Sequence, residues 1–383
     1  MSNASFSDLI PPASHPTETH PLSALHSAPP QSFVFIDALR GIAALLVVYF
    51  HLHLHGFIGY PEHPVPPGIE YWFLLGYFDL GKYAVATFFV ISGFLIPSTL
   101  SGRNADLRKY IVHRAFRLYP AYWLAILVAY FLPFLYAGRA GFPIWMGLVN
   151  LTMFQKFVGV PDAIGVFWTL QIEITFYIFC AVLYVTKQLE RRLSIVISML
   201  VLAMMVAVGR KVMHRELPVA LFIALALMFW GDLLRAYMRG AVTAKRTVVA
   251  TAIVAVSLVP ICWIGYQEAG FRYVTTYWAA MTTFLVAWRW RDAFPRSGPV
   301  FKVLTFLGAI SYGVYLLGGT VGNALAGHFY TGRVAQALYA ISASIVAAWL
   351  SFRFLEAPCI AMGKRIGKRW EPKPTPKTAT PSR

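Results

Sequence analysis

The sequence is poor in charge. Charged residues make up 13% of the 383 positions, whereas a soluble globular domain carries about a quarter. Hydrophobic residues reach 58%, and the mean hydropathy is +0.60. The net charge of +17 would suit nucleic-acid binding in a soluble protein, but here Lys and Arg fall between apolar blocks, as in membrane proteins. We therefore expect an all-α, polytopic integral membrane helical bundle in contact with membrane lipids, and no nucleic-acid partner.

Cysteine is also scarce. The three cysteines, Cys180, Cys262 and Cys359, form no CxxC or CxxxH pattern, so neither a disulfide framework nor a zinc site is indicated. Residues 1–32 contain no Lys or Arg and no apolar core, and a signal peptide would need both. We expect a disordered N-terminal tail at 1–32, a transmembrane domain at 33–360 and a basic, Pro-rich tail at 361–383.

Apolar blocks long enough to cross a bilayer, which takes roughly 20 residues, recur along the chain. About ten transmembrane helices are expected, near residues 34–55, 78–100, 118–137, 166–186, 193–210, 217–236, 247–265, 273–290, 303–325 and 334–355. The segment 140–157 is too interrupted to count and predicts a short interfacial or re-entrant helix.

The distribution of basic residues predicts the orientation. If both termini are cytoplasmic, the inner loops and tails hold 24 Lys and Arg and the outer loops hold seven, with 209–216 as the one local misfit. Basic residues concentrate on the cytoplasmic side of membrane proteins. The chain is therefore expected to be a multi-pass protein of the cytoplasmic (inner) membrane with both termini inside.

The first apolar block carries Asp37, Arg40 and His51. Arg40 and His51 are eleven residues apart, which brings them to one face of a helix about 16 Å apart, and Asp37 lies on nearly the same face. Ionisable groups in a bilayer usually face a bundle interior or a water-filled cavity. Alternatively, Asp37 and Arg40 pair near the interface and His51 marks the helix end. A metal site with His55 lacks a carboxylate ligand, so no metal is expected.

Two arginines precede the third block. Arg114 and Arg117 are three residues apart on one helix face, a spacing that suits a phosphate clamp. Topology or lipid-headgroup contact explains them equally well at this stage.

The chain resembles the membrane acyltransferase-3 family over nearly all of 33–360. The resemblance rests on six motifs in the family's order. The first is the R-x10-H pair of Arg40, which lies within IDALRG, and His51. The others are TFFVISGFLI at 87–96, RAFRLYPAYW at 114–123, FWTLQIEITFY at 167–177, ISYGVYLL at 310–317 and RFLEAP at 353–358. Two positions depart from the pattern: Gly318 stands where the family's late signature usually has His, and Thr169 stands where Ser is commoner in the tryptophan motif.

The resemblance implies transfer of an acyl group, in the first instance acetyl from acetyl-CoA, to a hydroxyl of an extracytoplasmic or lipid-linked saccharide. Acyl-CoA is a substrate, and no permanently bound cofactor is expected. Arg114 and Arg117 would hold CoA phosphates, and Arg40 would stabilise oxyanion charge or guide the pantetheine arm. His51 would activate the acceptor hydroxyl directly or carry the acyl group as a relay; both routes stay open.

Glu173 is the second catalytic candidate. It shares a helix face with Thr169 and Tyr177, whereas Trp168 lies off that face, and it would orient or deprotonate His51. A structural hydrogen bond to a neighbouring helix is the alternative. Trp168 and Tyr177 are supporting residues in this interpretation.

Further supporting positions are expected to pack or hydrogen-bond. Ser311, Tyr312 and Tyr315 belong to this group, Ser92 and Gly93 are expected to permit close packing or a break in the second span near the cavity, and Glu356 is expected to be structural.

Two other functions remain open: acylation of a small molecule such as a macrolide or a lipid, and transport without acyl transfer. The combination of R-x-x-R with R-x10-H favours the enzyme, because a sugar carrier has no need for it. The sequence does not indicate an oligomeric state.

Overall fold

The computed structural model describes residues 33–51, 76–101, 105–138, 140–326 and 333–370. The regular structure of these residues is helical. The long helices are α1 (Val34–Tyr49), α3 (Leu80–Leu95), α4 (Leu107–Phe131), α7 (Phe167–Val185), α8 (Arg192–Met213), α9 (Val219–Met238), α10 (Ala244–Tyr266), α11 (Gly270–Arg289), α12 (Gly298–Ala326) and α13 (Arg333–Ser351). Shorter elements are α5 (Phe134–Ala137), α6 (Ile144–Asn150) and α14 (Ala357–Lys368), the 3-10 turns η4 (Pro97–Leu100), η5 (Gln155–Val158), η6 (Gln267–Ala269) and η7 (Arg291–Ala293), and the π-turn η8 (Phe352–Glu356).

The long helices coincide with the ten predicted blocks. Seven segments of the described chain are long and apolar enough to span a membrane, and one of them, Ala244–Arg289, contains both α10 and α11. The two remaining blocks are α1, which has 16 residues, and α4, which begins with basic residues that lower its hydropathy. The prediction of an all-α, polytopic membrane protein is confirmed.

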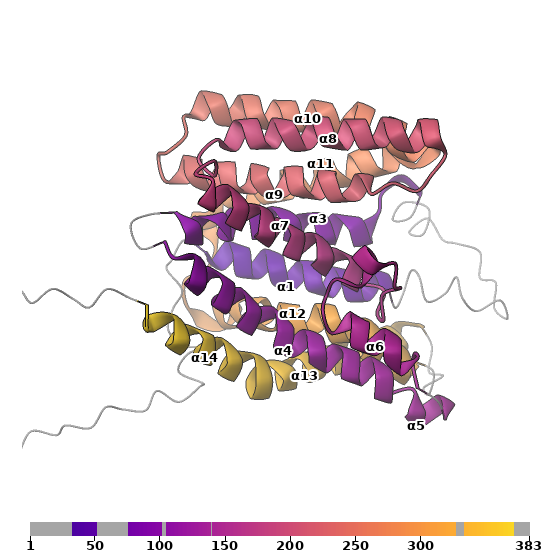
Figure 1. Ribbon diagram of the computed structural model, residues 1–383. Helices are drawn as coiled ribbons and strands as arrows, with labels where there is room; N and C mark the ends of the chain where they lie inside the picture. Colours follow the sequence, from indigo (N-terminus) through magenta and orange to yellow (C-terminus); the bar gives the residue numbers. More distant parts are fainter. Residues whose placement is uncertain (1–32, 52–75, 102–104, 139, 327–332, 371–383) are drawn as a thin grey trace, which may run out of the picture.

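Helix α1 lies inside the bundle, and the long helices run roughly parallel to one another (Figure 1). It packs against α12 on one side and α3 on the other, and α3 continues the contact to α9 and α11. Helix α9 is covered by α8, and α12 by α13. A polar face on α1 is therefore shielded from lipid by its neighbours.

A pair of glycines explains how closely α3 and α9 approach. A Cβ at Gly93 of α3 would collide with the Met228 carbonyl of α9, and a Cβ at Gly231 of α9 would collide with the Val90 carbonyl of α3. Small residues at such crossings let backbones touch in membrane bundles. The close approach predicted at Gly93 is confirmed.

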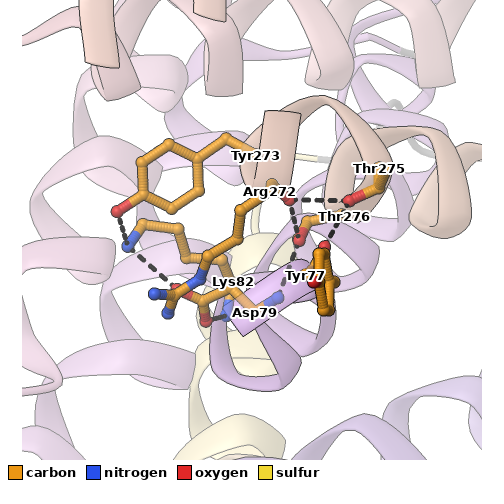
Figure 2. Close-up of polar contacts among 7 residues, drawn as sticks. All are labelled: Tyr77, Asp79, Lys82, Arg272, Tyr273, Thr275 and Thr276. Carbon is orange, nitrogen blue, oxygen red and sulfur yellow. Dashed lines mark hydrogen bonds and ion pairs between the residues drawn. The ribbon is translucent and has the colours of Figure 1, made fainter. Parts of the chain in front are cut away.

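A network of ion pairs and hydrogen bonds ties the N-terminal ends of α3 and α11 together (Figure 2). Asp79, 3% exposed, accepts hydrogen bonds from the backbone N of Lys82 at 2.8 Å and from Arg272 at 2.8 Å. Its own backbone N–H donates to Thr276 at 2.9 Å, and the Lys82 ammonium donates to the Tyr273 hydroxyl at 3.1 Å. This network caps α3 and fixes its position against α11.

The structure defines the helices within two of the predicted segments. The segment 140–157 contains the seven-residue helix α6, in agreement with a short helix that does not span. The expected tail at 361–383 begins within α14, which starts with Pro358 in its first turn and runs to Lys368. Gly363 and Gly367, one turn apart, let α14 lie against Phe116 and His113 of α4. Residues 1–32 and 371–383 lie outside the described chain.

Candidate functional site

A cavity of about 470 Å³ opens among α1, α3, α4, α7, α9 and α12. Its apolar walls come chiefly from α3. Its polar lining consists of Arg40, Ser92, Ser98, Thr99, Arg114, Arg117, Thr169, Glu173, Tyr177, Arg235, Ser311, Tyr312 and Tyr315. The structure thus brings together seven of the ten site residues expected from the sequence: Arg40, Arg114, Arg117, Glu173, Tyr177, Ser311 and Tyr312.

Positive charge dominates this cavity. Arg40, Arg114, Arg117 and Arg235 all line it, and the one carboxylate among its described lining residues is Glu173. The ion pairs of the described chain include none of these four arginines. The Nε atoms of Arg114 and Arg235 are buried and have no hydrogen-bond partner in this part of the structure. Buried charge without a counter-ion is costly, so the cavity is suited to an anionic ligand.

Helix α4 presents both predicted clamp residues to the cavity, which agrees with their i, i+3 spacing. The α4 N-terminus is capped by Asp106, which accepts from the backbone N of Arg108 at 2.7 Å. The Arg114 guanidinium lies 5.8 Å from the Tyr110 ring centroid and 5.5 Å from that of Tyr177. These rings orient Arg114 without neutralising it.

Glu173 faces the cavity from α7 together with Thr169 and Tyr177, as predicted. The Tyr177 hydroxyl donates to its Oε1, and the Ser92 hydroxyl donates to the same oxygen at 3.5 Å. Among the described residues no bond joins Glu173 to His51, so the predicted carboxylate–histidine pair is not formed there. Its hydrogen bond to Ser92 of α3 matches the alternative of a bond to a neighbouring helix.

Arg40 and Asp37, both on α1, contact different parts of the structure. Arg40 points into the cavity, where the charges of Arg117, Asp37 and Glu173 act on it. Asp37 packs against α12, where Gly308 leaves room for its side chain. No ion pair joins Asp37 to Arg40 in the described structure, so the alternative of a simple interfacial pair is not supported.

His51 stands at the far end of α1, about three turns or 16 Å from Arg40 along the helix. It follows the last α-helical residue in a π-turn, and its ring shares a hydrogen bond of 2.8 Å between Nδ1 and the Val47 carbonyl. A carbonyl oxygen only accepts, so Nδ1 carries the proton and Nε2 holds the lone pair of the neutral ring. His51 is not among the described residues that line the cavity.

The supporting residues on α12 hold helices together. Tyr312 donates to the Leu118 carbonyl of α4 at 3.0 Å, and the buried Ser311 donates to the Gly308 carbonyl of its own helix at 2.8 Å. Both behave as predicted for packing and hydrogen-bonding residues. Trp168 packs partly buried against the core and does not line the described cavity, consistent with its place off the Glu173 face. Glu356 is 2% exposed and accepts from Ser351 at 3.0 Å, as expected of a structural residue.

The packing around Gly318 explains why this chain has Gly where the family pattern usually has His. A Cβ at this position would collide with Val48 of α1, one turn before His51. The Gly318 carbonyl accepts from Ser344 of α13 at 3.2 Å. Helix α12 therefore sits too close to α1 and α13 for an imidazole at 318 in this chain.

The sequence did not single out one of the residues that shape the cavity, Arg235. Arg235 counted only toward the charge of an inner loop, and no motif marked it. Tyr315 was expected to pack and hydrogen-bond, and its hydroxyl lies 2.6 Å from the Thr169 hydroxyl of α7, a partner that depends on how α12 packs. Within the described ranges no group of His, Cys, Asp or Glu is placed to hold a metal ion. His53 and His55, which would join His51 in the alternative metal site, lie outside those ranges.

Comparison with curated proteins finds several similar chains. A putative acetyltransferase of Acidianus two-tailed virus is 29% identical over 39% of this chain and 40% of its own length. Nodulation protein 10 of Rhizobium leguminosarum bv. viciae is 29% identical over 37% of this chain and 41% of its own. A putative peptidoglycan O-acetyltransferase of Bacillus subtilis is 32% identical over 44% of this chain and 26% of its own.

The matched region spans less than half the length of each of these curated relatives. No solved structure matches the chain. The acyltransferase-3 family model, described as an acyltransferase domain, matches residues 33–353. That range takes in every helix that contributes to the arginine-lined cavity, and the chain therefore belongs to the acyltransferase-3 family.

Proposed function

We propose that this protein transfers an acyl group, in the first instance acetyl, from cytoplasmic acyl-CoA to a hydroxyl of an extracytoplasmic or lipid-linked saccharide. The observation that carries the proposal is the membrane-embedded cavity with four arginines, which form no ion pair with any described residue, and a single carboxylate among the described lining residues. A transporter of neutral sugars gains nothing from that charge, whereas a CoA donor brings several phosphates to it.

The rest of the lining suits the rest of the donor. Phe88, Phe89 and Leu95 of α3, with Leu118 and Leu170, give the cavity apolar surface beside its arginines. A pantetheine arm with a short acyl group is mostly apolar and binds such walls, while the phosphates remain with the guanidinium groups.

The donor side follows from the expected orientation. Arg114 lies in the first half of α4, and Arg235 lies near the end of α9. Arg40 lies in the first half of α1. With both termini cytoplasmic, all three positions are at the cytoplasmic ends of their helices, where acyl-CoA is available. His51 then lies toward the opposite side, where an extracytoplasmic acceptor would arrive.

Acyl transfer then needs a path between the two ends of α1. The pantetheine arm would extend from the arginines past Phe88 and Tyr315, whose ring centroids are 5.8 Å apart, toward His51. His51 Nε2 would take the proton of the acceptor hydroxyl while the hydroxyl oxygen attacks the thioester carbonyl. The carbon–sulfur bond breaks, CoA leaves as the thiolate and takes up the proton, and an ester remains on the acceptor.

The saccharide acceptor rests on the relatives. One is named a putative peptidoglycan O-acetyltransferase and another a peptidoglycan O-acetyltransferase of Listeria monocytogenes, 27% identical over 37% of this chain and 22% of its own length. Both names describe acetyl transfer to a hydroxyl of a glycan, and this supports the same class of acceptor here.

The test uses membranes that contain the wild type, His51→Ala or Arg114→Ala, supplied with radiolabelled acetyl-CoA. We expect His51→Ala to lose at least 100-fold in label transfer to endogenous glycan, because the base that activates the hydroxyl is gone. Arg114→Ala should raise the acetyl-CoA concentration needed for half-maximal transfer about tenfold or more.

Two variants serve as matched controls. Arg108→Ala removes an exposed arginine of the same helix α4, and His214→Ala removes an exposed histidine at the end of α8; both should transfer like the wild type. Wild-type rates in His51→Ala would show that His51 is not the base. Label recovered in a lipid or small molecule, with none in glycan, would replace the saccharide acceptor.

A further inference from the structure

Arg235 reaches the cavity from α9 and is held there by aromatic rings. Its guanidinium carbon lies 4.5 Å from the ring centroid of Phe33 and 5.1 Å from that of Phe94. Its Nε is buried without a hydrogen-bond partner in the described structure. Stacking of this kind fixes the plane of the guanidinium and leaves its N–H groups to bind in that plane.

The nearest acid on α9 does not neutralise Arg235. Asp232, one turn earlier and 2% exposed, accepts from Arg192 of α8 at 2.9 Å. Arg192 also donates to Glu190 at 2.7 Å. The charge of Asp232 is therefore balanced by Arg192 and not by Arg235. The positive charge of Arg235 is thus available to a ligand in the cavity.

Arg235 also approaches from a different wall than the R-x-x-R pair. Helix α9 packs against α3 and α8, whereas α4, which carries Arg114 and Arg117, packs against α12 and α14. A ligand with a single anionic group needs only one of these walls. CoA carries two phosphate groups at separate positions, a pyrophosphate beside the pantetheine arm and a 3′-phosphate on the ribose.

We propose that Arg235 binds a phosphate of the CoA donor and forms, with Arg114 and Arg117 on the other wall, a two-sided phosphate site. The inference rests on the proposed function, and it adds a binding residue that lies in no motif of the sequence. A charged hydrogen bond from the fixed guanidinium to a phosphate oxygen is the interaction that would hold the donor there.

The experiment measures binding to purified full-length protein in detergent by isothermal titration. The ligands are CoA, 3′-dephospho-CoA and pantetheine, and the proteins are the wild type, Arg235→Gln, Arg235→Lys and Arg239→Gln. Arg239 is the matched control, because it is exposed on the same helix end one turn further on. The melting temperature of each variant verifies folding.

We expect Arg235→Gln to weaken CoA binding at least tenfold, with pantetheine binding unchanged, because only the phosphates are affected. Arg235→Lys should bind CoA more tightly than the glutamine variant, because it keeps the charge, and Arg239→Gln should match the wild type. If Arg235→Gln discriminates CoA from 3′-dephospho-CoA less than the wild type does, the contact is to the 3′-phosphate. Equal loss for both ligands places it at the pyrophosphate.

CoA binding by Arg235→Gln within twofold of the wild type would overturn the inference, as would an equal loss of pantetheine binding, which would mark Arg235 as a structural residue. Failure of the wild type itself to bind CoA would instead refute the proposed donor. The two failures are therefore distinguishable.

Discussion

At the scale of single residues, the cavity is defined by an imbalance between four arginines and one acid among its described lining residues. Glu173 is bonded to Tyr177 and Ser92 and faces guanidinium groups from other helices. Under the proposed function its charge therefore has two consequences: it offsets part of the positive field that would attract phosphates, and it positions the Tyr177 and Ser92 hydroxyl groups in the cavity where the donor would bind.

Removal of the Glu173 charge is therefore expected to affect CoA binding and acyl transfer in opposite directions. Glu173→Gln keeps the shape of the side chain and removes its negative charge, so CoA should bind as tightly as to the wild type or more tightly. Acyl transfer at saturating donor should fall about tenfold or more, because the hydrogen bonds to the carboxylate are weakened. Glu268→Gln, at an exposed position, is the control. Weaker CoA binding in Glu173→Gln would contradict this account.

At the scale of elements, helix crossings decide which side chains meet. Gly93 and Gly231 bring α3 and α9 into backbone contact, and this contact brings Ser92 and Arg235 to one cavity. The network around Asp79 fixes the other end of α3 against α11 (Figure 2). Helix α3 is therefore held at both ends, which suits the wall of a binding site.

The crossing can be tested with a matched pair of substitutions. Gly93→Ala places a methyl group on the Met228 carbonyl and should lower the free energy of unfolding by about 1–3 kcal/mol or more, because the backbones must separate. Gly319→Ala makes the same change on α12, where no atom lies within 4 Å of the added methyl, and should be neutral or slightly stabilising. Thermal unfolding in detergent measures both. Equal melting temperatures would show that the crossing tolerates a side chain.

At the scale of the whole molecule, the cavity and His51 lie toward opposite ends of α1, so the proposed reaction joins two faces of the bundle. The charge bias would place the arginines on the cytoplasmic side, and His51, the proposed base, on the other. Orientation in the membrane therefore decides which substrate reaches which end.

Cysteine accessibility in intact cells tests this orientation. We expect a membrane-impermeant maleimide to label Arg215→Cys directly and to label Ala241→Cys only after permeabilisation, because the charge bias predicts the first to lie in an outer loop and the second in an inner one. Both positions are exposed, and the substitutions are made in a Cys359→Ser background, because Cys359 is partly exposed whereas Cys180 and Cys262 are buried. The reverse pattern would invert the topology and place the arginines outside. Because 209–216 is the local misfit of the charge count, it is the sharpest position to probe.

The sequence by itself determined the features that depend on neighbours within one helix. Apolar length gave the spans, and helical spacing gave the shared faces of Arg114 with Arg117 and of Glu173 with Tyr177. These relations follow from a 3.6-residue turn and need no partner helix.

Only the tertiary structure decided which faces meet. It turned Arg235 from a loop charge into a cavity residue, packed Asp37 against Gly308, paired Glu173 with Ser92, and filled the space beside Gly318 with Val48. Each result depends on a crossing between helices distant in sequence, and such crossings are set by packing, which one helix's residue pattern does not contain.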